Sequence, residues 1–509
     1  MLASLNTLVI TGIDAMPVKV EIDIQSGLPV FDIVGLAQAA LKEARERVKS
    51  AIKNNGYQFP NHRIVVNLAP ADIKKEGTHF DLPIALGILI ASGQVSMSLG
   101  YNYYFAGELS LDGSLRQVPG ILPMVLALMN LAGEQTIVIP SANSREAGLV
   151  TEVRSLASNS LAEICSFLEG QDTLTSVMAS GSETYSPPAL QPDFGDVRGQ
   201  EMAKRALQVA AAGMHNILLI GPPGGGKTML ARRLPSILPE MSREEVLETT
   251  RIYSVANLLN PDYPLVNTRP FRAPHKNASS ASIIGGGRIP RPGEISLAQN
   301  GVLFMDEFPE FSRDVLEALR QPLEDKVVTV ARAQATSTYP ANFSLVASCN
   351  PCPCGFYGSD LECHCSPPQI QKYLGRISGP LLDRMDLQVE VPRVNFEQLR
   401  GNSNTESSEV IRSKVQEARE IQYRRFSRYK VNLNSEMRSS DVRRFCVLDS
   451  ESESLLKQAF DKLNMSARGH DRVLKVARTI ADLDHSESIN MPHLAEALQY
   501  RSLDRKYWK

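Results

Sequence analysis

The stretch Gly221-Pro-Pro-Gly-Gly-Gly-Lys-Thr228 constrains the fold more than any other part of the chain. It follows a short apolar run of strand length, Asn216–Ile220, and precedes a run of helical character, Met229–Leu234. A strand, a glycine-rich loop, Lys-Thr and a helix in this order form a P-loop. Its glycines let backbone N–H groups close around phosphate oxygens, and the helix N-terminus adds partial positive charge. The sequence therefore predicts an α/β domain that binds a nucleoside triphosphate.

The loop itself supplies the first nucleotide contacts. Lys227 is expected to reach the β- and γ-phosphates, and the hydroxyl of Thr228 to ligate Mg²⁺. The remaining residues expected to surround ATP are Gly221, Pro222, Pro223, Gly224, Gly225 and Gly226.

Two carboxylates end the apolar strand Gly301–Glu307, which is the Walker B pattern. Asp306 is expected to hold Mg²⁺, mainly through water, and Glu307 to orient and deprotonate the attacking water. The next apolar run ends at Asn350, which predicts a polar side chain at the height of the γ-phosphate. Arg384 follows in a motif that presents a finger to the nucleotide of a neighbouring subunit, and a solvated arginine at a helix end is the alternative.

Length and charge narrow the protein class. A chain of 509 residues allows roughly three domains. The net charge of −2 argues against a protein that coats nucleic acid over its whole surface, although a local basic patch remains compatible. No apolar run approaches the roughly 18 residues of a membrane span, and no signal peptide is apparent. We therefore expect a cytoplasmic protein with reduced thiols and no membrane contact.

Residues 1–170 predict a mixed α+β domain. Val18–Ile24 alternates as a strand does, Ala39–Ile52 is amphipathic, and an Asp-Gly turn at 112–113 indicates a hairpin. Residues 171–192 are rich in Ser, Thr and Pro and predict a linker. The ATPase core is expected at 193–395 and a helical lid at 396–509.

The first domain resembles the proteolytic domain of Lon, in the ribosomal S5 domain 2-like fold, through Gly107–Gly120 and Lys75–Gly77. That family uses a Ser-Lys dyad. The corresponding loop Phe80–Ala85 has no serine, and Ile121–Pro123 stands where the lysine is expected. Without a nucleophile and a base there is no acyl transfer, so the resemblance implies a non-proteolytic role in assembly or client handling.

The ATPase core resembles the magnesium-chelatase-like AAA+ ATPases of the ComM/YifB group. The matching motifs are Arg269–His275, Pro292–Ala298, Leu316–Glu324 and Asn350–Gly355. With the Lon-like domain, the resemblance covers essentially the whole chain, and it implies a homo-oligomeric ring, a hexamer. One departure is His275-Lys276, where the group has a His pair.

Two inserts in the core are candidate DNA contacts. Asp325–Tyr339 predicts a hairpin, which the resemblance places at the pore of the ring, with Lys326 and Arg332 touching phosphates. An ordinary edge hairpin is the alternative. The insert Gly285–Gly293 is too rich in Gly and Pro for regular structure and carries Arg288 and Arg291 as further pore residues.

The lid reads as almost entirely helical. Positions 411–430 hold seven basic and two acidic residues, a local charge of +5, which suits a solvated face or a phosphate-facing patch. Ser466 is a good helix N-cap. The resemblance assigns Arg468 to the sensor 2 position, which reaches the bound nucleotide from the lid, with Arg472 one turn later as the alternative.

Five of the seven cysteines fall between Cys349 and Cys365. A Cys-x-Cys pair, eight residues and a second Cys-x-Cys pair place four thiolates where they suit tetrahedral, structural Zn²⁺. The four candidate ligands are Cys352, Cys354, Cys363 and Cys365. Reduced, metal-free loop cysteines are the alternative.

These features predict an ATP- and Mg²⁺-dependent ring ATPase. The resemblance implies a DNA motor, a branch-migration helicase that acts on single-stranded or branched DNA during integration of transforming DNA and homologous recombination. A magnesium-chelatase-like motor that drives metal insertion is one alternative, and a protein-remodelling ATPase is the other.

Overall fold

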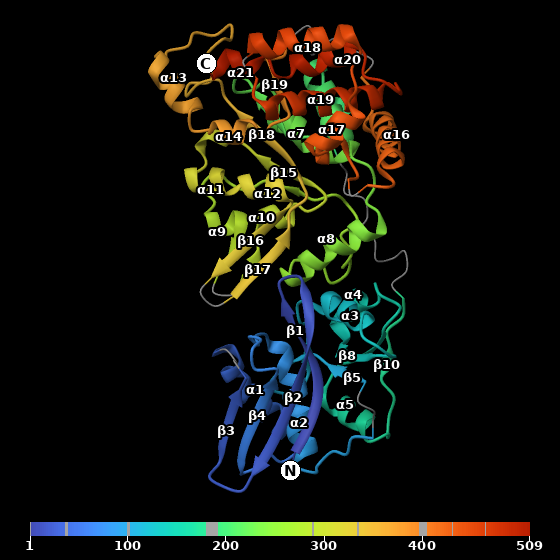
Figure 1. The fold of residues 1–509 in the computed structure, drawn as a ribbon. Coiled ribbons are helices and arrows are strands. Elements are labelled where there is room, and N and C mark those ends of the chain that lie inside the picture. The colour runs from blue at the N-terminus through green and yellow to red at the C-terminus, as the bar shows by residue number, and fades with distance from the viewer. Residues whose placement is uncertain are drawn as a thin grey trace. The chain divides into compact units, whose positions relative to one another are not determined.

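The computed structural model describes residues 2–35, 39–98, 102–179, 192–287, 290–332, 335–395, 405–429, 431–463 and 465–508. The chain divides into two compact units (Figure 1). Unit 1 comprises residues 1–187 together with 243–267, and unit 2 comprises 188–242 and 268–509. Each unit has a hydrophobic core of its own.

Unit 1 is built on an eight-stranded mixed sheet in the order β10-β9-β8-β5-β1-β2-β4-β3. The strands are β1 (Leu2–Thr11), β2 (Asp14–Gln25), β3 (Val30–Val34), β4 (Arg63–Ala69), β5 (Tyr103–Phe105), β8 (Thr136–Pro140), β9 (Arg154–Ser158) and β10 (Thr175–Ser176). In β4, Ile64, Val66 and Leu68 are buried and their neighbours are more exposed, the alternation of a strand with one face on a core. The expected α+β class is confirmed.

Helices α1 (Ala39–Asn54), α2 (Asp81–Ala91), α3 (Ile121–Met129) and α5 (Leu161–Leu168) complete this unit. The N-terminus of α2 carries an ion pair in which Arg47 Nε donates to Asp81 Oδ2 over 2.6 Å. Burial raises the pKa of Asp81 to about 6, and the Arg47 guanidinium opposes that rise. The loop that holds the nucleophile in Lon-like proteases therefore carries a buried ion pair here.

Helix α8 (Arg243–Val255) belongs to unit 1, although its position in the sequence lies inside the predicted ATPase core. It packs on α3, and Ser254 Oγ donates to Glu146 Oε1 over 2.5 Å. Residues 238–242 separate it from the helix that follows the P-loop. The unit also extends past the predicted start of the linker, because β10 pairs with β9; residues 180–191 of that linker lie outside the described residues.

Unit 2 contains a five-stranded sheet in the order β12-β15-β18-β11-β19, with every neighbouring pair parallel. Its strands are β12 (Phe271–Arg272), β15 (Val302–Met305), β18 (Ser344–Cys349), β11 (Ile217–Ile220) and β19 (Leu387–Glu390). All residues of β11, β15 and β18 are buried, as the continuous apolar runs of the sequence require of parallel strands covered on both faces. This is the predicted α/β core.

The lid consists of helices α16 (Ser408–Phe426), α17 (Ser439–Phe445), α18 (Ser450–Leu463), α19 (Ala467–Leu483), α20 (Met491–Gln499) and α21 (Leu503–Tyr507). Helices α16 and α19 pack on α6 (Glu201–Gly213). Arg419 and Gln422 of α16 donate to the carbonyls of Ala211 and Ala212, the last acceptors of α6 that lack partners within the helix. Within the described ranges, no helix is both long and apolar enough to cross a membrane.

Two hairpins project from the core. β16 (Val327–Arg332) and β17 (Ala335–Pro340) confirm the first expectation. The second was wrong, because β13 (Gly285–Gly286) pairs with β14 (Arg291–Pro292) in a short ladder. A Cβ at Gly285 would lie 2.4 Å from the Arg291 carbonyl oxygen, so the glycine that argued against regular structure is what lets the two backbones approach.

Candidate nucleotide site

The ends of three parallel strands bring the predicted nucleotide residues to one edge of the sheet. Ile220 pairs with Cys349, and Met305 pairs with Ala347. The P-loop follows β11, Asp306 follows β15 and Asn350 follows β18. Ligands of open α/β sheets bind outside this carboxyl edge. The register alone therefore brings together segments that are about 130 residues apart in the sequence.

The P-loop closes around the ammonium group of Lys227, the first residue of α7 (Lys227–Ile237). Lys227 Nζ donates to the carbonyl oxygens of Gly221 and Pro222 over 2.7 and 3.0 Å, and to Asn350 Oδ1 over 3.1 Å. Burial lowers the pKa of Lys227. No residue with a side chain fits at position 221, because a Cβ at Gly221 would lie 2.1 Å from the carbonyl oxygen of Val391. Loop carbonyls thus hold the charge that is predicted to meet phosphate.

The two predicted Mg²⁺ ligands are in direct contact. Thr228 Oγ1 donates to Asp306 Oδ2 over 2.8 Å. The other oxygen of Asp306 accepts from the Ser348 hydroxyl and, over 3.0 Å, from the Glu307 amide. Ser348 was not predicted, although a hydroxyl inside the apolar run of β18 is a visible signal. These contacts orient Asp306 toward Thr228, which suits two groups that share one cation.

The predicted base Glu307 has a partner that sequence reasoning missed. Lys276 Nζ lies 2.5 Å from Glu307 Oε2, and this hydrogen bond raises the pKa of Lys276. Glu307 adopts a left-handed backbone conformation with φ 51°, which is uncommon for a residue other than glycine. While this ion pair holds, Oε2 of Glu307 is engaged with the Lys276 ammonium and is not available to orient the attacking water. In the sequence, Lys276 stands out only because it replaces the second histidine of the family's His pair.

Arg384 lies at the opposite edge of the same sheet. Leu387 pairs with Ile217, so the residues before β19 stand beside Asn216, whose side chain donates to the Arg384 carbonyl over 3.1 Å. Five residue steps lead from Asn216 to Gly221, a backbone span of about 16 Å at about 3.3 Å per strand residue. The guanidinium is 8 % exposed and pairs with Glu324. Arg384 is therefore distant from the P-loop of its own chain.

Arg468 and Arg472 belong to the same arginine cluster. Arg468 Nη2 lies 4.0 Å from Glu324, the carboxylate that also holds Arg384. Arg472 Nη1 donates to Asp386 Oδ1 over 2.7 Å. Burial alone would raise the pKa of Asp386, but Arg472 and His215 hold it below its usual range. The geometry thus groups Arg468 with Arg384 rather than with the P-loop of the same chain, where the sequence analysis had placed it.

The four predicted zinc ligands converge. Their Sγ atoms all lie within 4.8 Å of one another, with Cys352 3.3 Å from Cys354 and 3.7 Å from Cys363. Tetrahedral zinc with bonds of about 2.3 Å would set these sulfurs about 3.8 Å apart. The amide of Gly355 donates to Cys352 Sγ over 3.2 Å, which stabilises a thiolate. The donor chemistry and spacing therefore fit a structural zinc ion held by Cys352, Cys354, Cys363 and Cys365.

The candidate DNA residues have different placements. Lys326 stands at the base of the β16–β17 hairpin, and burial lowers its pKa. Arg332 ends β16 beside the turn, and exposed Arg291 begins β14. Arg288 lies outside the described residues. Lys326 is half-buried, and Lys326, Arg291 and Arg332 all remain candidates for phosphate contacts.

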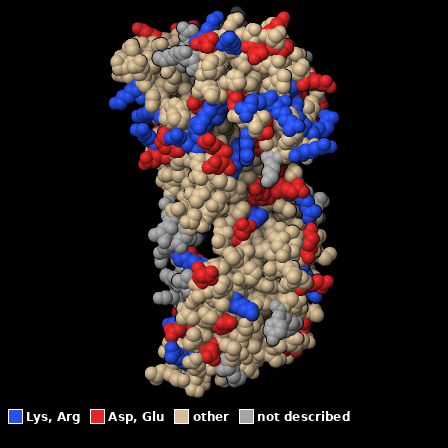
Figure 2. All heavy atoms as spheres, in the orientation of Figure 1, with Lys and Arg blue, Asp and Glu red and all other residues tan. Residues whose placement is uncertain are grey.

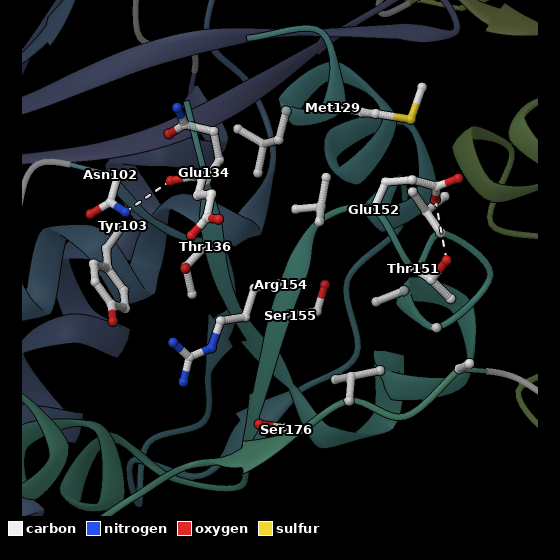
Figure 3. A pocket seen from close by; sticks show the side chains of 18 of the residues that line it. Asn102, Tyr103, Met129, Glu134, Thr136, Thr151, Glu152, Arg154, Ser155 and Ser176 are labelled. Atoms are coloured by element: carbon white, nitrogen blue, oxygen red, sulfur yellow. Dashed lines mark hydrogen bonds between the residues drawn. The ribbon is translucent and has the colours of Figure 1, made fainter. Parts of the chain in front are cut away.

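A cavity of about 610 Å³ lies in unit 1 (Figure 3). Its lining includes Glu134, Thr136, Glu152 and Arg154, and the Asn102 side chain donates to the Glu134 carbonyl over 2.9 Å. None of the predicted nucleotide residues lines it. Its polar residues form no nucleophile–base or metal-ligand cluster among the described residues, so we assign it no chemistry.

Comparison with protein families covers most of the chain. Residues 193–399 match the family model "Magnesium chelatase, subunit ChlI", residues 20–143 match "Subunit ChlI of Mg-chelatase", and residues 405–501 match the ChlI C-terminal model.

Individual relatives match at two levels. The chain is 45% identical over 499 residues to "Competence protein ComM" of Haemophilus influenzae, across 97% of this chain and 96% of the relative. It is 44% identical over 508 residues to the uncharacterised protein YifB of Escherichia coli, across 99% and 98%. The 38 kDa magnesium-chelatase subunit of Rhodobacter capsulatus is 28% identical over 232 residues, across 42% of this chain and 58% of that subunit.

Replacing Lys276 by Gln is expected to raise the basal rate of ATP hydrolysis severalfold, because the change frees the Glu307 carboxylate while keeping a polar side chain. Steady-state ATPase assays measure the rate, and Lys53→Gln, an exposed lysine of unit 1, is the charge-matched control. Glu307→Gln is the reference without a base. It should bind ATP while turnover falls by about 100-fold or more. A fall in rate for Lys276→Gln would contradict the restraining role.

Proposed function

The chain belongs to the ComM/YifB family of magnesium-chelatase-like AAA+ ATPases, and from that premise we propose a ring motor that couples ATP hydrolysis to work on DNA. We assign it branch migration during recombination, including integration of transforming DNA, with single-stranded or branched DNA as its partner. Two observations support this client: the nearly full-length similarity to a competence protein, and a pair of core hairpins that pack together and carry arginines.

In the proposed reaction each nucleotide residue has one task. Lys227 exchanges its loop carbonyl partners for phosphate oxygens, and Thr228 and Asp306 hold Mg²⁺. Glu307 takes a proton from the attacking water after its ion pair with Lys276 opens. Asn350, which already accepts a hydrogen bond from Lys227, places its side chain at the γ-phosphate. Bound Mg²⁺ supplies charge neutralisation on the β- and γ-phosphates.

The arginines complete the site of a neighbour. Because Arg384 and Arg468 share Glu324 at the far edge of the sheet, neither has a short path to the P-loop of its own chain. A head-to-tail ring brings that edge against the next subunit's nucleotide, where a guanidinium stabilises charge on the transferring phosphoryl group. We therefore propose a homo-oligomer, a hexamer, in which both arginines act in trans.

The two hairpins form one candidate DNA contact. β13 packs on β16, and Tyr339 of β17 donates its hydroxyl to the Pro290 carbonyl over 2.7 Å, which ties the second hairpin to the first. Arg291 and Arg332 therefore belong to one projection rather than to two separate loops. Lys and Arg side chains on such a projection supply the sequence-independent attraction to phosphates.

Metal insertion is the second candidate function. Similarity to the magnesium-chelatase subunit covers 42% of this chain, against 97% for the competence protein. The family model that matches residues 20–143 also carries the ChlI name, so that name alone does not discriminate between the two functions. A protein-remodelling ATPase, like a metal-insertion motor, would hydrolyse ATP without any response to DNA, so the same assay separates the DNA motor from both alternatives.

The double variant Arg291→Gln/Arg332→Gln should keep its basal ATPase and lose stimulation by branched DNA. Arg291 lies in β14 and Arg332 in β16, and neither belongs to the P-loop or to the strand ends of the nucleotide site. ATPase rates with and without single-stranded and branched DNA measure the effect. Arg63→Gln/Arg116→Gln removes the same charge from exposed positions of unit 1 and should retain stimulation. Full stimulation of the hairpin variant would rule out the projection as the DNA contact, and a parent enzyme indifferent to DNA would rule out the DNA motor.

We also propose that the four-cysteine cluster holds structural zinc and supports the P-loop. The Gly355 backbone packs against Pro223, and a Cβ at Gly355 would lie 2.5 Å from Pro223 Cδ. The cluster thus fixes a loop that abuts the nucleotide site. Four thiolates leave no open position, so zinc here has a structural rather than a catalytic role.

Purified protein without a metal-binding tag should contain about one zinc per chain by elemental analysis. Cys352→Ser/Cys363→Ser should lose the metal and bind ATP more weakly, because the loop against Pro223 is no longer held. Cys446→Ser removes a buried cysteine of the lid and is the control that keeps zinc. Metal-free parent protein with full ATP affinity would refute the zinc assignment.

A further inference from the structure

The exposed ends of two lid helices carry arginines that the nucleotide site does not use. Figure 2 shows Lys and Arg gathering over the region of α16 and α17. The described members are exposed arginines at the end of α16, just after it, and along α17. They are Arg424, Arg428, Arg438, Arg443 and Arg444, which we call the lid arginine face.

The same helix shows what a structural arginine looks like in this fold. Arg419 of α16 is buried and donates to the Ala211 carbonyl, and Arg425 pairs with Asp482 in the core of the lid. Within the described part of the chain, no member of the lid arginine face forms an ion pair. Helix α16 therefore separates arginines that stabilise the lid from arginines that present their charge to solvent.

Nearby acidic groups are committed to other partners. Glu436 accepts from the Asn432 amide over 2.9 Å, and Asp441 accepts from the Arg438 amide at the start of α17. Asp471 accepts from the Ser439 hydroxyl over 2.6 Å. These carboxylates cap backbone and hydroxyl donors and keep their negative charge, but three carboxylates against five guanidinium groups leave positive charge in excess at this surface.

Aromatic rings contact one arginine of the lid arginine face, Arg444. The Arg444 guanidinium lies 5.1 Å from the centre of the Tyr429 ring and 5.6 Å from that of Phe445. Phe445 in turn packs edge-on against Tyr429 and Phe426, with ring centres 5.3 Å apart in each pair. Tyr423 and Tyr429 remain 44 % and 36 % exposed. A stacked guanidinium keeps its N–H donors free and loses less entropy when it binds an oxyanion.

We propose that the lid arginine face binds the phosphate backbone of DNA as a second contact, separate from the hairpin projection. Exposed guanidinium groups without an ion-pair partner among the described residues, one of them stacked on aromatic rings, match a polyanion that also offers bases for stacking. The inference rests on the proposed action on DNA and adds a holding surface to it. The hairpins couple DNA to hydrolysis, and the lid face raises the affinity for DNA.

The variant Arg424→Gln/Arg428→Gln/Arg443→Gln tests this while leaving the Arg444 stack intact. Equilibrium binding to branched DNA is measured from 50 to 200 mM salt, together with basal and DNA-stimulated ATPase. Loss of three phosphate contacts should make the plot of log affinity against log salt less steep by about 2.7. Between 50 and 200 mM salt, the affinity of the variant should therefore fall by a factor about 40 times smaller than the affinity of the parent does. Basal ATPase and the maximal rate at saturating DNA should not change.

The charge-matched control is Lys53→Gln/Arg63→Gln/Arg116→Gln, three exposed positions of unit 1. It should keep the parent slope. An unchanged slope in the lid variant, or an equal loss in the control, would overturn the lid face. A parent protein that binds no DNA at 50 mM salt would overturn both the DNA motor and the lid face. Loss of maximal stimulation in the lid variant would overturn the division of roles between lid and hairpins.

Discussion

The short parallel sheet of unit 2 fixes the distance between two charged clusters on which everything else depends. Its four-residue strand β11 begins beside the arginine cluster and ends at the P-loop. Strand residues rise about 3.3 Å each, so the backbone beside Arg384 at one edge is about 16 Å from the P-loop at the other. Chemistry that needs both ends therefore needs two copies of the sheet, and a ring satisfies this requirement at every interface.

Without nucleotide or neighbour, each reactive charge has a substitute partner within the chain. Lys227 is held by loop carbonyls, Glu307 by Lys276, and Arg384 by Glu324. Each of these internal partners forms a hydrogen bond or ion pair with a charged group whose burial without a partner would be costly. In the proposed reaction these internal partners are exchanged for phosphate, water and the next subunit, so turnover in the proposed ring depends on assembly.

The sequence was most informative where chemistry is encoded in local spacing. The P-loop, Asp306, Glu307, Asn350 and the cysteine array follow from motifs, since strand ends and short loops place them. The contact of Lys276 with Glu307 was not predictable because the two residues are 31 positions apart in the sequence, and the placement of Arg384 depends on the register between β11 and β19. Arg468 lies beside Glu324 at the start of helix α19, whose packing the sequence pattern does not specify. The sequence also could not predict that residues 243–267 belong to unit 1, because the pattern of an amphipathic helix does not specify which core the helix covers.

Subunit mixing tests the split site most directly. Lys227→Ala removes the phosphate lysine and Arg468→Ala removes the lid arginine, whose side chain is 63 % exposed and dispensable for packing. Each variant alone should be nearly inactive. If Arg468 acts in trans, co-assembled rings pair an intact P-loop with an intact neighbouring arginine at about one quarter of the interfaces, and ATPase activity should return to about that fraction. A mixture as inactive as its components would show that Arg468 serves its own subunit and would contradict the account.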